Sequence, residues 1–254
     1  MSITASLVTD EKDLTGIYRL RYKVYCLEWG FEKPDNNDSG ILTDVFDKHA
    51  VHFALKNSSQ KVIAAVRLIL DSEDGFPLER YCELNINNGD LPRDGLAEIS
   101  RLVIHRDYRR RAEDKYVFGP DEERRSIGSF DFQYQSSNNR YSARRFEDRY
   151  GGTRHNAQRH NASNYERRQR HELVIGLYKA VYQESRRRQL THWYAVMTKG
   201  IALLIEKLGL KFDVIGDPVD YHGIRTPYLG KISETERVMS ETVPDLYEEF
   251  SRGK

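Results

Sequence analysis

Charged side chains stand inside apolar segments of the first hundred residues, where a charge is costly. Arg67 lies in the run IAAVRLIL, and Glu98 and Arg101 lie in AEISRLVI. Both runs are apolar enough to form buried strands, and a buried charge costs several kcal/mol unless it is paired. Two acids three residues apart, Asp44 and Asp47 in TDVFD, offer the opposite charge. The pattern indicates a buried polar site.

Glu98 is the residue that we expect to act as a general base. An amine must lose a proton to attack a thioester, and a nearby carboxylate accepts that proton directly or through water. The alternative is a plain salt bridge between Glu98 and an arginine. Asp44 and Asp47 either bind an acceptor amine, hold Arg67 and Arg101, or are solvated loop acids.

Residues 13–29 are predicted to form a helix, because apolar and aromatic side chains recur at intervals of three and four. Asp13 or Thr15 is the expected N-cap. On this helix Arg21 either pairs with an acid, binds an acceptor carboxylate or is an exposed charge. Trp29 either lines an acceptor pocket or belongs to the core.

The rest of the chain reads as strands and helices in alternation. Strands are predicted at 49–57, 61–70, 96–105, 191–198, 211–216 and 226–233, and helices at 172–188, at 199–209 with Gly209 as C-terminal cap, and over TERVMSETVPDLYEEFSR. The first two strands form an antiparallel pair across the turn SSQ. In the third, alternation puts Glu98 and Ser100 on one face and Arg101 on the other. This order predicts a mixed α/β sheet.

Charge is distributed unevenly along the 254 residues, although the net charge is only +1. Residues 1–100 carry 11 basic and 17 acidic side chains, residues 101–192 carry 21 and 12, and the remainder carries 8 and 10. The segment 106–170 holds 15 arginines and few aliphatic residues. We expect it to be a long insertion, mobile unless a partner orders it, and suited to an acidic partner.

Several classes of protein are disfavoured by composition. Hydrophobic residues make up 39% and charged residues 31%, and no apolar run approaches the roughly 18–20 residues of a membrane span. No signal peptide is evident, so a cytoplasmic protein is expected. Cys26 and Cys82 form no CxxC pair, and His49 and His52 have no evident third ligand. We therefore expect neither a disulfide scaffold nor a bound metal or other cofactor.

The ordered set of polar residues resembles the acyl-homoserine-lactone synthase branch of the GNAT acyltransferases over roughly residues 15–105. Those enzymes carry an N-terminal arginine followed by aromatics, two acids three apart, a strand arginine, and a glutamate and arginine three apart. The matching positions are Arg21, Tyr25, Trp29, Asp44, Asp47, Arg67, Glu98 and Arg101.

Three features depart from that pattern. Tyr25 replaces the usual phenylalanine, Trp29 follows it too soon, and ordinary lactone synthases lack the arginine-rich insertion. The RDYRRR run and the later YHGIRTPYLG segment are more similar to PEP-CTERM/exosortase-associated acyltransferases and to N-acyl amino acid synthases.

The resemblance implies a single GNAT-like domain over residues 1–254, with a mostly antiparallel central sheet flanked by helices. It implies an N-acyltransferase that moves a fatty acyl group from a thioester to the amine of an amino acid or a derivative. The implied catalytic residues are Glu98, Arg101, Asp44, Asp47 and Arg67. The implied substrate-binding residues are Arg21, Tyr25, Trp29 and Ser100.

The acyl donor is predicted from the segment after the third strand. A typical GNAT enzyme binds the coenzyme A pyrophosphate at a Gly-rich turn there, whereas RDYRRRAED has no glycine before Gly119. This favours the phosphopantetheine thioester of an acyl carrier protein over acyl-coenzyme A. The acidic carrier protein would dock on Arg109, Arg110 and Arg111.

Two alternatives from other classes remain open. The Arg/Tyr-rich insertion could bind nucleic acid, with steep salt dependence. The net acidic first hundred residues oppose that interpretation, so we expect no nucleic-acid partner. A GNAT-like scaffold that binds an acyl chain or a carrier protein without turnover is the other alternative.

Overall fold

A computed structural model describes residues 5–33, 39–87, 89, 91–108 and 172–252. The first part holds β1 (Ser6–Leu7), α1 (Glu11–Arg21), the π-helical η1 (Tyr22–Glu28), η2 (Val45–His49), β2 (Ala50–Lys56), β3 (Val62–Leu70), α2 (Pro77–Tyr81), η4 (Arg93–Gly95), β4 (Leu96–Ile104) and η5 (Arg106–Tyr108). The second holds a helix over residues 172–187, β5 (His192–Met197), α6 (Lys199–Glu206), β6 (Asp213–Val214), β7 (Val219–Asp220), β8 (Ile224–Lys231), α7 (Ile232–Thr242) and α8 (Pro244–Ser251). Nearly all of the predicted insertion lies outside the described residues.

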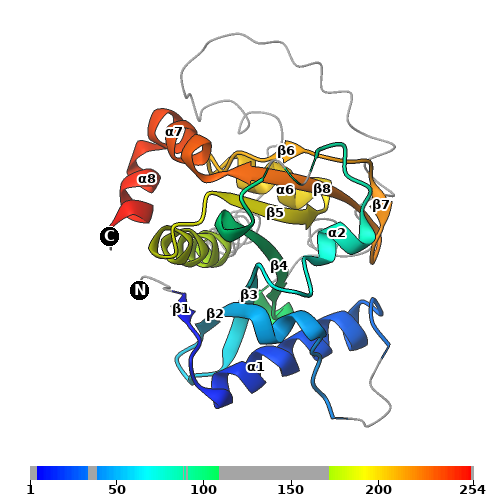
Figure 1. Cartoon of the computed structure of the whole chain (residues 1–254). Coiled ribbons are helices and arrows are strands. Elements are labelled where there is room, and N and C mark those ends of the chain that lie inside the picture. Colours follow the sequence, from blue (N-terminus) through cyan, green and yellow to red (C-terminus); the bar gives the residue numbers. More distant parts are fainter. Residues whose placement is uncertain (1–4, 34–38, 88, 90, 109–171, 253–254) are drawn as a thin grey trace, which may run out of the picture.

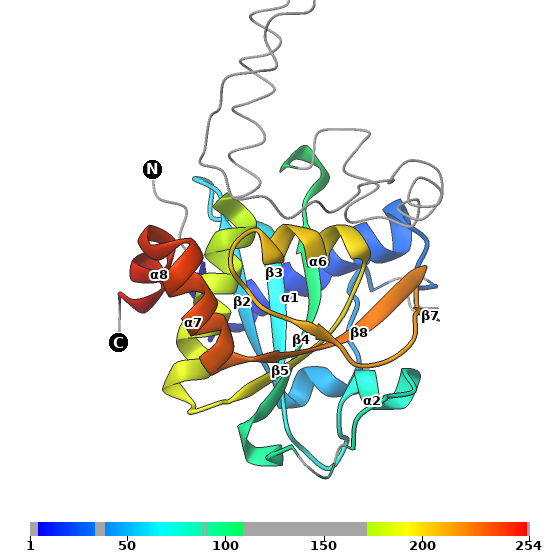
Figure 2. The same cartoon turned by 90° about the horizontal axis from the view of Figure 1, so that it is seen from above.

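The two parts share one mixed sheet, in the order β1-β2-β3-β4-β5-β8-β6, with β7 paired to β8 (Figure 1). All of its pairings are antiparallel except that of β4 with β5, which is parallel. The predicted antiparallel pair and the mixed, mostly antiparallel sheet are confirmed. The strands β5 and β8 diverge widely from β2, β3 and β4 when seen from above (Figure 2).

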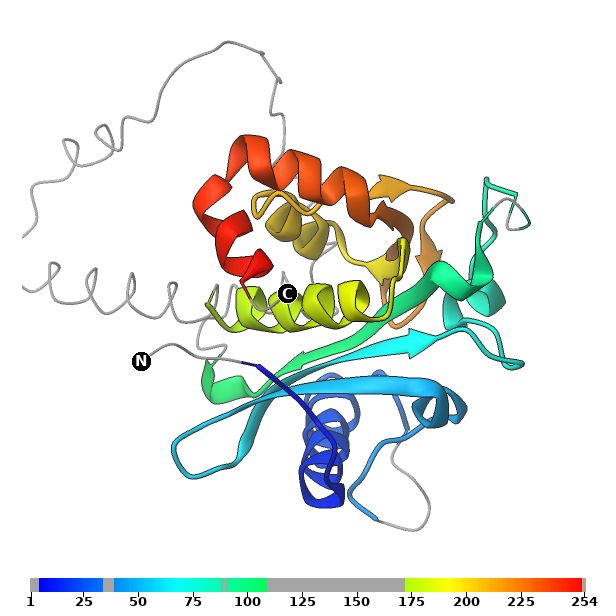
Figure 3. The same ribbon diagram turned by 60° about the vertical axis from the view of Figure 1, so that its left-hand side comes forward.

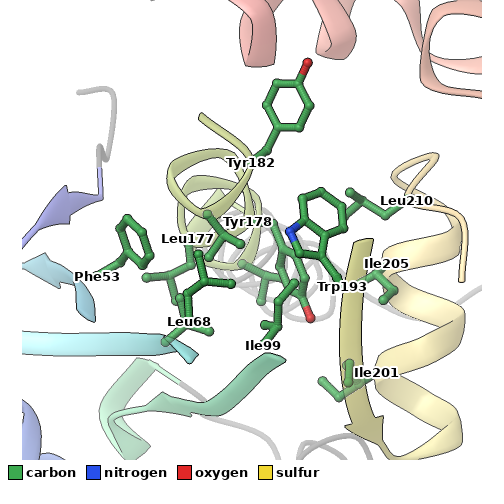
Figure 4. Close-up of a cluster of buried hydrophobic side chains, with 14 of the residues drawn as sticks. Phe53, Leu68, Ile99, Leu177, Tyr178, Tyr182, Trp193, Ile201, Ile205 and Leu210 are labelled. Carbon is green, nitrogen blue, oxygen red and sulfur yellow. The ribbon is translucent and has the colours of Figure 1, made fainter. Parts of the chain in front are cut away.

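Helices cover both faces of the sheet (Figure 3). The helix at residues 172–187 and α6, α7 and α8 cover one face, where Leu177, Ile201 and Phe250 belong to one buried cluster with Trp193 of β5. Figure 4 shows Leu177, Trp193 and Ile201 in that cluster. The helix α1 covers β2 and β3 on the other face. Since burial of apolar side chains is the main favourable term in folding, this two-faced core is what holds the strands that carry the site.

The first helix differs from its sequence-based prediction at both ends. It begins at Glu11, and Asp10 is the N-cap, since its side chain accepts a hydrogen bond of 2.8 Å from the backbone N–H of Asp13. After Arg21 the backbone widens into η1, where the N–H of Trp29 bonds to the carbonyl of Val24 at 3.0 Å. A π-helical turn carries one more residue than an α-turn and is not visible as a hydrophobic period.

The C-terminal third also departs from the predicted boundaries. The strand predicted at 211–216 is only the two-residue β6, and β7 was not predicted at all. The predicted closing helix is two helices that meet at Val243 and Pro244. Proline lacks an N–H donor and disfavours helical backbone in the residue before it, so a new helix begins there.

None of the helices in the described ranges has the length and apolarity that a membrane crossing requires.

Candidate active site

A β-bulge in β4 determines which side chains meet at the site. Ser100 pairs with Arg67 of β3, and Val103 pairs with Ala65, so two β4 residues lie opposite Val66 alone. Arg101, the first of those two, has a φ of +53°. Alternation therefore fails at this point, and the prediction that Arg101 lies on the face opposite Ser100 is wrong.

The bulge turns Arg101 toward the same carboxylates that Arg67 contacts. Its guanidinium bonds to Asp44 at 3.0 Å and to Glu32 at 2.9 Å, and it lies over the Tyr25 ring at 5.5 Å. A positive φ is uncommon for a residue with a long side chain and is strained. Two ion pairs and a ring contact compensate for that strain.

Asp47 joins the first helix to the sheet. Its Oδ1 lies 2.7 Å from Nη1 of Arg21 and 2.8 Å from Nη1 of Arg67, and both guanidinium groups are only 1–2% exposed. Asp44 lies 2.6 Å from Arg67. Of the alternatives left open by the sequence, the structure places both aspartates as partners of the arginines, and it places Arg21 as the partner of an acid.

The three arginines and their carboxylates lower one another's free energy of burial. Although burial alone would raise it, the charges of Arg21 and Arg67 hold the pKa of Asp47 well below its ordinary value. Hydrogen bonding to His222, aided by Arg101, lowers the pKa of Glu32 to about 2. We name this set the arginine–carboxylate cluster; its members are Arg21, Arg67, Arg101, Glu32, Asp44 and Asp47.

His52 belongs to the back of this cluster and not to a metal site. Its Nδ1 lies 3.1 Å from Nη2 of Arg21. Burial, with the neighbouring charge of Arg21, lowers the pKa of His52 to about 4, so the neutral ring accepts that hydrogen bond. His49 instead lies 3.4 Å from Asp74. No three His, Cys, Asp or Glu side chains of the described residues are arranged to hold a metal ion.

Glu98 is buried, with 2% of its surface exposed, and forms no ion pair with an arginine within the described residues. Its Oε2 accepts a hydrogen bond of 2.9 Å from the backbone N–H of Leu78 in α2. Burial raises the pKa of Glu98 to about 7, against the opposing effects of that N–H and of Arg67. A carboxyl group with such a pKa exchanges protons readily at neutral pH. The geometry therefore does not support the alternative of a salt bridge between Glu98 and an arginine.

Glu98 lines a pocket that opens where β4 and β5 separate. The two strands pair only as far as Ile99 and Ala195. One side of the pocket, the apolar half, is formed by Ile99, Leu102, Tyr178, Met197 and Ile201. The other side, the polar half, is formed by Tyr25, Trp29, Phe31, Arg67, Glu98, Ser100, Arg101, Tyr221, His222 and Arg225. The pocket thus joins an apolar space on one face of the sheet to a charged, aromatic space on the other.

Six of the nine predicted site residues that the structure describes line this pocket. Ser100 lines it and accepts a hydrogen bond of 3.0 Å from Nε of Arg67. Tyr25 donates a hydrogen bond of 2.8 Å to the carbonyl of Leu102, and Trp29 packs 5.7 Å from the Tyr25 ring. Arg21, Asp44 and Asp47 are members of the cluster that do not line the pocket. The carrier-protein contacts assigned to residues 109–111 lie outside the described residues.

Five residues of this region were missed by the sequence analysis. Glu32 and Phe31 follow the π-helical turn, and Tyr221, His222 and Arg225 come from the segment before and at the start of β8. His222 lies 3.3 Å from Glu32, and its ring packs 5.6 Å from that of Phe31. One signal in the sequence points to three of them, since the family-like segment YHGIRTPYLG contains Tyr221, His222 and Arg225.

The comparisons with known proteins agree with this geometry. Residues 20–118 match the family model described as acetyltransferase (GNAT) domain. No curated protein matches the chain in sequence. Residues 20–118 are thus similar to a GNAT acetyltransferase domain, and they hold β2, β3 and β4, the strands on one side of the opening in the sheet.

Solved structures with the same fold include lactone synthases and an amino acid acylating enzyme. The coenzyme A-dependent acyl-homoserine lactone synthase BjaI, with SAM and isopentyl-CoA, has a TM-score of 0.58 at 16% identity, covering 100% of this chain and 90% of its own. TofI, in a complex with an inhibitor and MTA, has a TM-score of 0.56 at 12% identity, covering 96% and 100%. FeeM, an N-acyl amino acid synthase from uncultured soil microbes, has a TM-score of 0.50 at 12% identity, covering 92% and 93%.

Replacement of Asp47 by asparagine tests the arginine–carboxylate cluster. Asp47→Asn leaves the buried Arg21 and Arg67 without the charge that they share, so we expect a loss of about 3–5 kcal/mol in the free energy of unfolding by urea titration. The control is Glu248→Gln, which removes the exposed ion pair between Glu248 and Arg252. Equal free energies of unfolding for the two variants would contradict the expected contribution of the cluster to stability.

The same cluster makes the free energy of unfolding depend on pH. The pKa values of Asp47 and Glu32 are lower in the folded chain than in the unfolded one, so the unfolded state binds more protons as the pH falls. The stabilisation is complete above the ordinary carboxyl pKa of about 4 and is lost progressively below it. Thermal unfolding measured between pH 3 and 6 should show a melting temperature that falls with the pH in the wild type. In Asp47→Asn the melting temperature should fall less.

Proposed function

We propose that the protein is an N-acyltransferase that moves a fatty acyl group from a thioester to the amine of a small acceptor. The observation that carries this proposal is the position of Glu98. It is a buried carboxyl group with a pKa of about 7, and it lines the pocket between the apolar half and the polar half. An acyl chain suits the first space, and a polar amine suits the second.

In this reaction Glu98 accepts a proton from the attacking amine. The amine nitrogen forms a bond to the thioester carbon, and the carbonyl oxygen becomes a tetrahedral oxyanion. Collapse of that intermediate breaks the carbon–sulfur bond, and the sulfur leaves as a thiol that takes the proton accepted by Glu98. Beyond Ile99 the backbone of β4 has no pairing with β5, which supports strand amides as the donors that stabilise the oxyanion.

The acceptor is proposed to be an amino acid or a derivative of one. The polar half holds the guanidinium groups of Arg101 and Arg225 and the imidazole of His222 beside the aromatic rings of Trp29 and Phe31. Such a space favours a carboxylate next to an apolar side chain. The fold that the chain shares with the N-acyl amino acid synthase FeeM is consistent with this class of acceptor.

The donor is proposed to be the thioester of an acyl carrier protein. The residues that follow β4 form η5, which contains no glycine and so does not reproduce the usual phosphate-binding turn. Within the cluster, Asp44, Asp47 and Arg67 are proposed as positioning residues for Arg101 and Ser100. The comparison with the coenzyme A-dependent BjaI makes acyl-coenzyme A the donor to test in parallel.

The test of this function measures thiol release from a long-chain acyl carrier protein and, separately, from acyl-coenzyme A. Each donor is supplied with a pool of amino acids, and the extract is examined by mass spectrometry. An acylated amine from the carrier-protein donor supports the whole proposal. Product from acyl-coenzyme A alone would identify acyl-coenzyme A as the donor in place of the carrier protein. The absence of product with either donor would contradict the proposed function.

The proposed base gives a specific expectation for Glu98→Gln. The amide keeps the shape of the side chain but cannot accept the proton, so kcat/KM should fall about 100-fold or more. In the wild type kcat/KM should rise with pH through about 7, because Glu98 must lose its proton to act as a base. Glu98→Gln should lack that step.

The matched control is Glu184→Gln, which removes a carboxylate that pairs with Arg187 and Arg188 outside the pocket. It should keep both the wild-type rate and the step near pH 7. A full rate in Glu98→Gln would contradict the base role.

A further inference from the structure

The short helix α2 supplies the hydrogen bond that Glu98 receives. The backbone N–H of Leu78 donates to Oε2 of Glu98 at 2.9 Å, and both residues are buried. The next residue along α2 is Glu79, which adds a second carboxylate to the surroundings of Glu98. Because like charges oppose each other, the charge of Glu79 disfavours the ionised form of Glu98.

Arg93 neutralises that second carboxylate and holds the helix that carries it. Its Nη1 lies 2.5 Å from Oε1 of Glu79, and its guanidinium lies over the Phe76 ring at 4.9 Å. Oε2 of Glu79 accepts a hydrogen bond of 3.3 Å from the backbone N–H of Phe76, at the start of α2. Nη2 of Arg93 lies 2.6 Å from Asp71, which directly follows β3. Arg93 is also the first residue of η4, so it joins α2 to the end of β3 and to the segment that leads into β4.

The ion pair between Glu79 and Arg93 lies above buried side chains. The Glu79 side chain is 18% exposed and that of Arg93 is 39% exposed, whereas Phe76 and Leu78 are fully buried. The Phe76 ring packs edge-on against Tyr194 of β5 at 5.7 Å. An exposed ion pair contributes little to stability, but its charges act more strongly on a buried neighbour, because less water screens them. The weight of this pair therefore falls on Glu98.

Other titratable groups of the described structure also act on Glu98. Arg67 of β3 favours its ionised form, and Asp44 beside η2 opposes that form. Both already belong to the arginine–carboxylate cluster, where they lie 2.6 Å apart. The remaining groups stay uncharged at neutral pH, because burial raises their pKa values to about 11 or 12; they are Cys82, Tyr194 and Tyr221.

We propose that Arg93 is a positioning residue for Glu98 and acts through α2. It holds the helix so that the N–H of Leu78 reaches the Glu98 carboxyl group, and it neutralises Glu79 on the same helix. The inference rests on the proposed function for the role of Glu98 as a base. Without Arg93, the uncompensated charge of Glu79 keeps the proton on Glu98, and less of the base is in its active form at neutral pH.

The experiment titrates the Glu98 carboxyl group directly, without substrate. Protein labelled with ¹³C in the glutamate carboxyl groups is followed by NMR through neutral pH, and the Glu98 signal is identified by its absence in Glu98→Gln. Arg93→Gln should raise the midpoint of this titration by about 0.5–1 pH unit, because Glu79 is then uncompensated. Glu79→Gln should lower it by about the same amount, because the opposing charge is gone while the amide oxygen still accepts hydrogen bonds.

The opposite signs distinguish this role from simple bracing of the helix. If the ion pair only braced α2, both variants would loosen the bond from Leu78 and both midpoints would rise. That result, or an unmoved midpoint in both variants, would overturn the inference. Arg93→Lys keeps the positive charge and should stay near the wild-type midpoint, whereas a rise as large as that of Arg93→Gln would contradict the charge role.

The matched control is Arg237→Gln, which removes the same charge from an exposed ion pair with Glu241 on α7. It should leave the Glu98 midpoint unmoved. An equal rise in this control would show an effect of net charge alone and would overturn the inference.

Turnover separates this inference from the proposed function. The step in kcat/KM near pH 7 should move with the NMR midpoint, upward in Arg93→Gln and downward in Glu79→Gln, while the rate above the step stays unchanged. Shifted midpoints without an acylated amine would support the role of Arg93 and contradict the transferase. Acylated amine formed while both midpoints stay unmoved would support the transferase and contradict the role of Arg93.

Discussion

The burial of three arginines beside the pocket is the constraint on which the site depends. Taking a guanidinium out of water is unfavourable by several kcal/mol unless carboxylates surround it. The arginine–carboxylate cluster meets that requirement with equal numbers of the two charges: Arg21, Arg67, Arg101, Glu32, Asp44 and Asp47. Its members come from α1, η2, β3, β4 and the segment after η1, so their pairing fixes how these elements meet.

The cluster also determines the state of Glu98. Since the arginines are matched by other acids, the Glu98 carboxyl group is left with a backbone N–H as its hydrogen-bond partner in the described structure. Burial then raises the pKa of Glu98 to about 7, because its effect exceeds the lowering effect of the neighbouring Arg67. The ion pairs of Arg101 hold the bulge in β4, and beside that bulge the pairing with β5 stops. The ion pairs of Arg101 therefore contribute both to the charge balance of the cluster and to the bulge at which the sheet opens.

The opening gives the pocket two different environments within one space. The apolar half continues the hydrophobic core between the sheet and the helix at residues 172–187. The polar half is walled by aromatic rings and guanidinium groups. The proposed transfer of an apolar acyl chain to a polar amine needs this contrast, and Glu98, whose pKa burial raises to about 7, lines the same pocket.

The sequence alone determined the fold class and much of the site. Hydrophobic periodicity is local, so it located the main strands and most helices. Charges at Arg67, Glu98 and Arg101 in apolar runs identified buried polar positions because burial makes such charges costly. The periodicity could not report the π-helical turn or the bulge, since each adds a residue that only backbone pairing reveals. The tertiary structure alone decided that Glu98 pairs with no arginine of the described residues, and that Glu32, His222 and Arg225 join the site. Those facts depend on contacts between residues far apart in the chain, which no local pattern records.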